Sequence, residues 1–64
     1  MITVNGKEQM YAAESVLALL ERMDFPTAAV AVERNGELLA KSAWERQLVA
    51  DGDVYEVIRF VGGG

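Results

Sequence analysis

The most apolar segment of the chain, residues 54–61, lies beside its C-terminal end, and the residues that follow it are Gly62, Gly63 and Gly64. A run of this length that is rich in valine, isoleucine and aromatic residues predicts a β-strand. A small sheet must cover its most apolar strand, so we expect this strand to be central, next to the first strand of the chain. Glycine has no Cβ, and a glycine peptide can therefore enter a channel too narrow for side chains. The chain is expected to be one domain, residues 1–61, that presents a flexible tail, residues 62–64.

Length and composition favour a single small globular domain. The chain has 64 residues, of which 52% are hydrophobic and 25% are charged. It contains neither cysteine nor histidine, which excludes disulfides, thiol chemistry and the usual ligands of zinc and other transition metals. We therefore expect no catalytic residue and no metal site in the chain, and a function that depends on partner proteins.

The net charge of the chain indicates which kinds of partner it can bind. Ten acidic and six basic residues give a net charge of −4. This excess of acid argues against nucleic-acid binding, which requires basic residues, and suits a basic partner surface, although it also helps to keep a small domain in solution. No apolar run is long enough to span a bilayer, and the first residues lack the pattern of a signal peptide. We expect a cytoplasmic protein that binds neither nucleic acid nor membrane.

Alternating side chains and turn dipeptides predict the strands. Asn5-Gly6 and Asn35-Gly36 are dipeptides typical of two-residue hairpin turns. Asp51-Gly52-Asp53 predicts another turn, directly before the last strand. The expected strands are residues 2–4, a return strand through about Tyr11, residues 29–32, residues 37–39 and residues 54–61.

One helix is predicted early in the chain. Ser15 can cap a helix that begins at Val16. The helix should end near Met23 or Asp24, because Pro26 prevents it from continuing. The apolar side chains that share one helix face and should cover the sheet are Val16, Leu19, Leu20 and Met23. With one helix and four to five strands in a mixed sheet, the predicted fold class is α+β.

The connection between the fourth and last strands, residues 41–47, is predicted to contain a short helical turn. Its Trp44 stands alone among polar neighbours. Because an indole carries a large apolar area, we interpret Trp44 as a core residue that anchors the connection and not as a ligand-binding residue.

Strand periodicity divides the last strand into two faces. Tyr55 and Val57 are the better core candidates, because burial of the unpaired carboxylate of Glu56 on the other face would be costly. Ile58 and Phe60 share the face of Glu56 and are therefore expected to be exposed. Beside the tail, and together with Val61, they form a predicted partner-binding surface. The alternative is that a twist of the strand or a loop covers them.

The chain resembles the thiamin-biosynthesis sulfur carriers of the ThiS type, which are ubiquitin-like β-grasp proteins. The resemblance extends over essentially all of the sequence, and its most specific part is the terminal Val-Gly-Gly-Gly. The segments that carry it are Asn5-Gly6, the helix start at residues 16–20, Val30-Ala31-Val32, Trp44, Asp51-Gly52-Asp53 and residues 60–64.

The resemblance implies a reaction at the terminal carboxyl of Gly64. A partner adenylating enzyme (ThiF type), which supplies the sites for ATP and Mg²⁺, would convert this carboxyl to an acyl adenylate. A sulfur donor protein would then displace AMP, and the resulting thiocarboxylate would pass its sulfur to thiazole synthase (ThiG type). The chain would be a carrier and substrate, with no cofactor of its own, and not an enzyme.

Three other functions remain open at this point. A sulfur carrier that is the small subunit of a molybdopterin synthase has the same fold and tail chemistry, although such relatives are usually longer. A ubiquitin-like modifier would join Gly64 to lysines of target proteins. An adaptor would make no use of its glycines.

Overall fold

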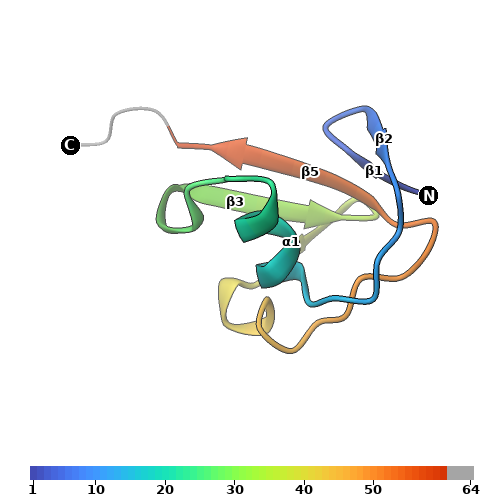
Figure 1. Cartoon of the computed structure of the whole chain (residues 1–64). Coiled ribbons are helices and arrows are strands. Elements are labelled where there is room, and N and C mark those ends of the chain that lie inside the picture. The colour runs from blue at the N-terminus through green and yellow to red at the C-terminus, as the bar shows by residue number, and fades with distance from the viewer. Residues whose placement is uncertain (61–64) are drawn as a thin grey trace.

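The computed structural model of the protein describes residues 1–60. Five strands form one sheet in the order β2-β1-β5-β3-β4. The last strand, β5, is central, parallel to β1 and antiparallel to β3 (Figure 1). This arrangement confirms the predicted mixed sheet. The strands are β1 (Ile2–Val4), β2 (Lys7–Gln9), β3 (Val30–Arg34), β4 (Glu37–Leu39) and β5 (Val54–Arg59).

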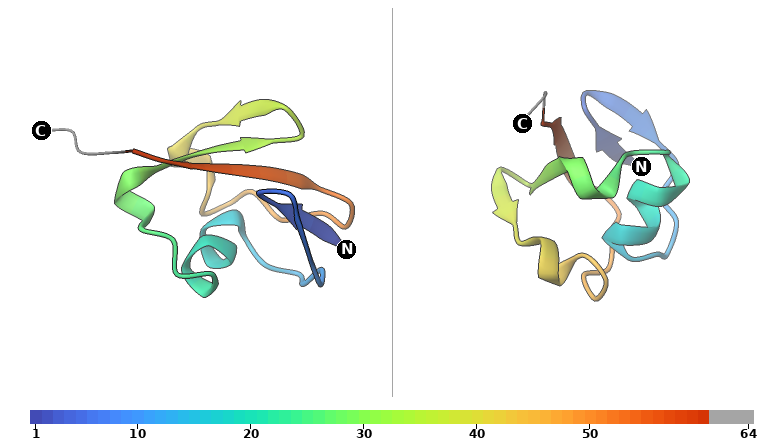
Figure 2. Two further views of the ribbon diagram at one scale, coloured as in Figure 1. Left: turned by 90° about the horizontal axis from the view of Figure 1, so that it is seen from above. Right: turned by 90° about the vertical axis from the view of Figure 1, so that its left-hand side faces the viewer.

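Helix α1 (Val16–Arg22) packs on one side of the sheet, and the views in Figure 2 show the two layers. Two short 3-10 helices, η1 (Thr27–Ala29) and η2 (Lys41–Ala43), connect the elements. The predicted helix face is confirmed, with three of its residues buried and Met23 partly buried. The core residues are Ile2, Val4, Val16, Leu19, Leu20, Val30, Val32, Trp44, Val49, Tyr55 and Val57.

Both ends of α1 follow from local hydrogen bonding. The hydroxyl of Ser15 accepts a hydrogen bond from the N–H of Ala18 at 3.1 Å, so the predicted N-cap is confirmed. At the other end Asp24 adopts a left-handed conformation, with φ of 60°. The N–H of Phe25 then donates to the carbonyl of Leu20 at 3.0 Å. This Schellman-type closure ends the helix at Arg22, before Pro26 is reached, so the predicted effect of Pro26 is not what stops it.

Both hairpin turns also bind the central strand. Asn5 and Asn35 have φ angles of 51° and 52°, the left-handed conformation that these tight turns require. The Asn5 side chain accepts a hydrogen bond from the N–H of Val57 at 2.7 Å, and the Asn35 side chain accepts one from the N–H of Val54 at 2.9 Å. The two asparagines therefore shape the turns and position β5 at the same time.

Asp53 joins the turn before β5 to the hairpin of β3 and β4. Asp53 is 4% exposed, and its carboxylate accepts four hydrogen bonds, from the Tyr55 hydroxyl, Arg34 Nε, Asn35 Nδ2 and the Ala50 N–H. Burial by itself would raise the pKa of Asp53, but these donors stabilise the carboxylate and lower its pKa to about 2. Burial and the bond to Asp53 raise the pKa of Tyr55 to about 12. The network fixes where β5 begins.

Three of the predicted strands have other boundaries in the structure. The return strand ends at Gln9 and not near Tyr11, because β1 begins at Ile2 and pairs no further along β2. The third strand is shifted to Val30–Arg34, since Ala29 belongs to η1. The ladder of β5 ends at Arg59, before Phe60.

Candidate functional site

The two faces of β5 are as the periodicity predicted. Tyr55 and Val57 point into the core and are 1% and 8% exposed, respectively. On the opposite face Ile58 is 48% exposed, and Phe60, just beyond the strand, is 60% exposed. The prediction that these two residues reach the surface is confirmed. Their expected companion Val61 lies outside the described residues.

The register of the sheet identifies the neighbours of Ile58. Ala31 of β3 lies directly opposite Ile58, and Glu33 lies opposite Glu56. Leu38 of β4 pairs with Glu33 from the other side and is 74% exposed. Because residues that pair across strands share a face, these side chains form one surface. We term this surface the outer face, which consists of Ala31, Glu33, Leu38, Val54, Glu56, Ile58 and Phe60.

The helix leaves the outer face uncovered. In Figure 2 α1 lies on the opposite side of the sheet, against the buried faces of β1 and β5. Within residues 1–60 no element packs over Ile58, which remains half exposed. An exposed apolar patch that includes Leu38, Ile58 and Phe60 is typical of a protein-binding surface.

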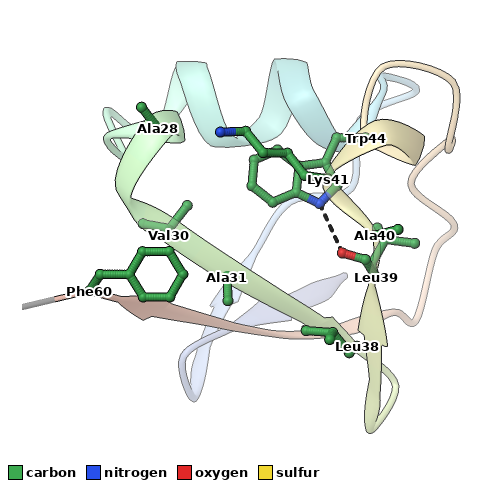
Figure 3. Close-up of a pocket in the computed structure, with 9 residues that line it drawn as sticks. All are labelled: Ala28, Val30, Ala31, Leu38, Leu39, Ala40, Lys41, Trp44 and Phe60. Atoms are coloured by element: carbon green, nitrogen blue, oxygen red, sulfur yellow. Dashed lines mark hydrogen bonds between the residues drawn. The ribbon is translucent and has the colours of Figure 1, made fainter. Parts of the chain in front are cut away.

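Sequence reasoning did not find Leu38. The segment Glu37–Leu39 contains two adjacent leucines, so alternation alone does not show which one is buried. In the structure Leu39 packs on the core, so its neighbour Leu38 points to the outer face. The Leu39 carbonyl accepts a hydrogen bond from the Trp44 indole at 3.2 Å (Figure 3). Trp44 is 2% exposed, which confirms its predicted place in the core.

The electrostatics of the outer face are acidic. The ion pairs among residues 1–60 join the N-terminal amine to Asp51, Arg22 to Glu14 and Arg34 to Asp53. None of them involves Glu33 or Glu56. A surface that combines apolar side chains with unneutralised carboxylates suits a partner that is apolar and basic.

The chain leaves the domain at the edge of this surface. The N–H of Phe60 donates to the carbonyl of Ala29 at 2.8 Å, which holds Phe60 beside the last residue of η1, just before β3 begins. Gly62, Gly63 and Gly64, predicted to enter a partner's active site and to carry the reactive group, lie outside the described residues. Their proposed roles therefore depend on the position of Phe60, four residues before Gly64.

We searched the described part of the chain for side chains that could bind a metal ion. No group of three or more acidic, histidine or cysteine residues in residues 1–60 is arranged to hold a metal ion. The same residues include no helix long and apolar enough to cross a membrane.

Comparisons with known proteins agree on one family. The family model described as the ThiS family matches residues 2–64. A sulfur carrier protein ThiS from Bacillus subtilis is 33% identical over 66 residues, which cover 100% of both chains. A thiazole synthase from Paramagnetospirillum magneticum is 41% identical over 64 residues. These residues cover 98% of this chain but 20% of that much longer relative.

Solved structures agree with the sequence matches. The crystal structure of a thiamine biosynthesis protein (ThiS) from Geobacter metallireducens has a TM-score of 0.83 and 37% sequence identity. The match covers 98% of this chain and 97% of that one. A solution NMR structure of a thiamine biosynthesis protein from the same organism has a TM-score of 0.75 and 36% identity, and covers 98% and 86% of the two chains, respectively. This similarity confirms the β-grasp fold.

Proposed function

This chain belongs to the ThiS family and is a sulfur carrier of thiamine biosynthesis, and we propose that the carboxyl group of Gly64 is the group that carries the sulfur. The observation that supports this site is the geometry of β5. The strand lies at the centre of the sheet, paired with β1 on one edge and β3 on the other, and it exposes Ile58 on the outer face. Beyond the strand, the chain leaves the domain at Phe60.

The proposed chemistry begins with activation of the carboxylate. An α-carboxyl group has a pKa of about 3.5 and is therefore an anion at neutral pH, which resists attack by nucleophiles. Attack of its oxygen on the α-phosphorus of ATP releases pyrophosphate and gives an acyl adenylate. Sulfur at the oxidation level of sulfide then attacks the carbonyl carbon and expels AMP, which leaves a thiocarboxylate on Gly64.

The catalytic groups for these steps belong to partners in this proposal. The sequence has no histidine or cysteine. An adenylating enzyme of the ThiF type would hold ATP and Mg²⁺, and a sulfur donor protein would deliver the sulfur. The chain is then a protein substrate and not an enzyme, and ATP-dependent loading of this kind would take place in the cytoplasm.

Thiazole synthase is the proposed acceptor of the sulfur. The relative from Paramagnetospirillum magneticum bears that name, and one segment of it matches this chain over nearly its full length. A segment similar to this chain is part of the same polypeptide as that synthase, which supports contact between a separate carrier and a separate synthase. We propose that this chain delivers sulfur to a separate synthase of the ThiG type.

The outer face is the proposed docking surface for these partners. Ile58 and Phe60 are exposed beside the exit of the chain, so a partner that receives Gly62 and Gly63 in its active site must cover them. The tail from residue 61 to residue 64 spans about 14 Å when extended, at about 3.5 Å per residue. Contact with Val61, Ile58 and Phe60 would therefore place Gly64 within reach of a recessed site.

Intact mass spectrometry tests the proposal. The chain is incubated with its cognate adenylating enzyme, ATP and a sulfide source. The expected product is heavier by the difference between one sulfur and one oxygen atom, and this gain disappears when Gly64 is deleted. If an enzyme of proven activity produces no gain, the proposed function is wrong.

A further inference from the structure

Both asparagines of the chain precede a glycine, in Asn5-Gly6 and Asn35-Gly36. These four residues form the two hairpin turns, and all of them are exposed. A glycine after an asparagine leaves its own backbone nitrogen open to the asparagine side chain, because no Cβ shields it. The two turns are therefore the places in this chain where an asparagine amide is most easily lost.

Loss of the amide needs water but no cofactor, oxidant or enzyme. The backbone nitrogen of the glycine loses its proton and attacks Cγ of the asparagine. The new C–N bond closes a five-membered succinimide ring, and the bond from Cγ to the amide nitrogen breaks, so that ammonia leaves with the proton. Water then opens the ring at one of its two carbonyl carbons. The product is aspartate or isoaspartate, with no change of oxidation state.

The backbone conformation of both turns opposes ring closure. Closure requires the glycine nitrogen to lie on the same side of the Cα–C bond as Cβ. Asn5 and Asn35 have φ angles of 51° and 52°. The ψ of about +47° that accompanies this left-handed conformation places the glycine nitrogen nearly opposite Cβ. The backbone must therefore leave the turn conformation before the ring can form.

Hydrogen bonds to the last strand and its preceding turn fix both side-chain amides. Asn5 Oδ1 accepts from the N–H of Val57 at 2.7 Å, and Asn5 Nδ2 donates to the Val57 carbonyl at 3.3 Å. Asn35 Oδ1 accepts from the N–H of Val54 at 2.9 Å, and Asn35 Nδ2 donates to the Asp53 carboxylate at 3.1 Å. Rotation of either amide toward its glycine breaks both of its bonds, which protects the folded chain.

We propose that Asn5 and Asn35 are covalent modification sites that lose their amides when their turns separate from β5, and that the product at Asn35 is the more damaging. Isoaspartate at either site adds a carbon to the main chain, which changes the length of a two-residue turn. Aspartate at Asn35 replaces an N–H donor by an oxygen beside the carboxylate of Asp53, which is 4% exposed. Two carboxylates at this distance repel, so the network that fixes the start of β5 is weakened.

Peptide mapping by mass spectrometry tests the route. The chain is incubated at mildly alkaline pH, folded in buffer or unfolded in urea, and each turn is followed by the mass difference between an amide and a carboxylic acid. Both asparagines should react in the unfolded chain, and about tenfold or more slowly in the folded chain, where the turns must first open. An unfolded chain that does not react, or equal rates in the two states, overturns the inference.

A substitution of one glycine isolates the ring closure. In urea Gly6→Ala should slow the reaction of Asn5 about tenfold, because the new Cβ shields the attacking nitrogen. The strain that alanine would suffer at the φ of 80° in the folded turn is absent from the unfolded chain. Asn35 should keep its rate and serves as the internal control. An unchanged rate at Asn5 would show that the amide is not lost through the ring.

Three variants compare the consequences of the reaction. Asn5→Asp and Asn35→Asp reproduce the aspartate products, and Gln9→Glu makes the same change from amide to acid on β2. Asn35→Asp should have the lowest urea midpoint of the three, because only there does the new charge meet Asp53. Failure of Asn35→Asp alone to fold supports the same conclusion. A midpoint for Asn35→Asp equal to that of Asn5→Asp or Gln9→Glu contradicts it. None of these measurements depends on the carrier function.

Discussion

Glu33 on β3 and Glu56 on β5 lie directly opposite each other on the outer face of the sheet. Neither carboxylate takes part in an ion pair with another residue of the described chain. Like charges in this position repel across the strands and destabilise the free domain. A basic group of a partner placed between them would relieve this repulsion.

Replacement of one of these carboxylates should stabilise the free chain. Glu56→Gln removes the repulsion and should raise the free energy of unfolding by about 0.2–1 kcal/mol, as measured by urea denaturation. The same variant should associate more slowly with the adenylating enzyme and show a weaker dependence on salt. Glu45→Gln, an exposed change of equal charge away from the sheet, is the control. A less stable Glu56→Gln variant would contradict this reading.

Methyl groups on the tail should block loading. Gly63→Ala and Gly64→Ala each add a Cβ in a segment that is proposed to enter a narrow channel, so the gain of sulfur should be lost in the mass assay. The melting temperature should not change, because these residues follow the last strand. Normal loading of both variants would refute the channel.

A charge on the outer face should weaken partner binding without unfolding the domain. Ile58→Asp and Phe60→Asp place a carboxylate in the apolar patch, and we expect KM for adenylation to rise about tenfold or more. Leu48→Asp is the matched control, since Leu48 is 66% exposed and does not belong to the outer face. Loss of the cooperative melting transition in the first two variants would show that these residues support the core instead.

The free energy of unfolding should fall at low pH as the carboxylate of Asp53 becomes protonated. Its pKa is about 2 in the folded chain against an ordinary value of 3.8, so its contribution is complete above about pH 4 and is lost as the pH falls toward 2. The loss should be about 2 kcal/mol, measured as the free energy of unfolding in urea across this range. Asp53→Asn should lower stability at pH 7 and remove most of this dependence.

The exposed substitution Asp24→Asn serves as the comparison for Asp53. Asparagine tolerates the left-handed conformation at this helix end, so the variant should keep the acid dependence of the unmodified chain. If Asp53→Asn and Asp24→Asn respond to acid alike, the Asp53 network does not control stability in this range.

At high pH the free energy of unfolding should depend on the ionisation of Tyr55. Burial and the bond to Asp53 raise its pKa to about 12 from an ordinary value of 10.0. The folded chain therefore holds the phenolic proton more tightly than the unfolded chain, and this contribution to stability is complete below about pH 10 and is lost as the pH rises toward 12. Tyr55→Phe should flatten that decline.

Local chemistry was sufficient to predict much of this protein. The Asn5-Gly6 and Asn35-Gly36 turns, the cap at Ser15 and the alternation along residues 54–60 each depend on neighbours in the sequence, and the structure confirms each of them. The exposure of Ile58 and Phe60 followed from the same alternation, because one face of a central strand must meet the helix.

Tertiary structure decided the features that depend on residues far apart in the chain. The opposition of Glu33 and Glu56 and the exposure of Leu38 require the register of three strands. Strand β4 ends before it reaches Val30, whereas β5 pairs with β3 along its whole length. The sequence determined which residues form strands, turns and helix, since those preferences are local. Pairing register and strand length came from packing, since they depend on which partner each backbone group meets.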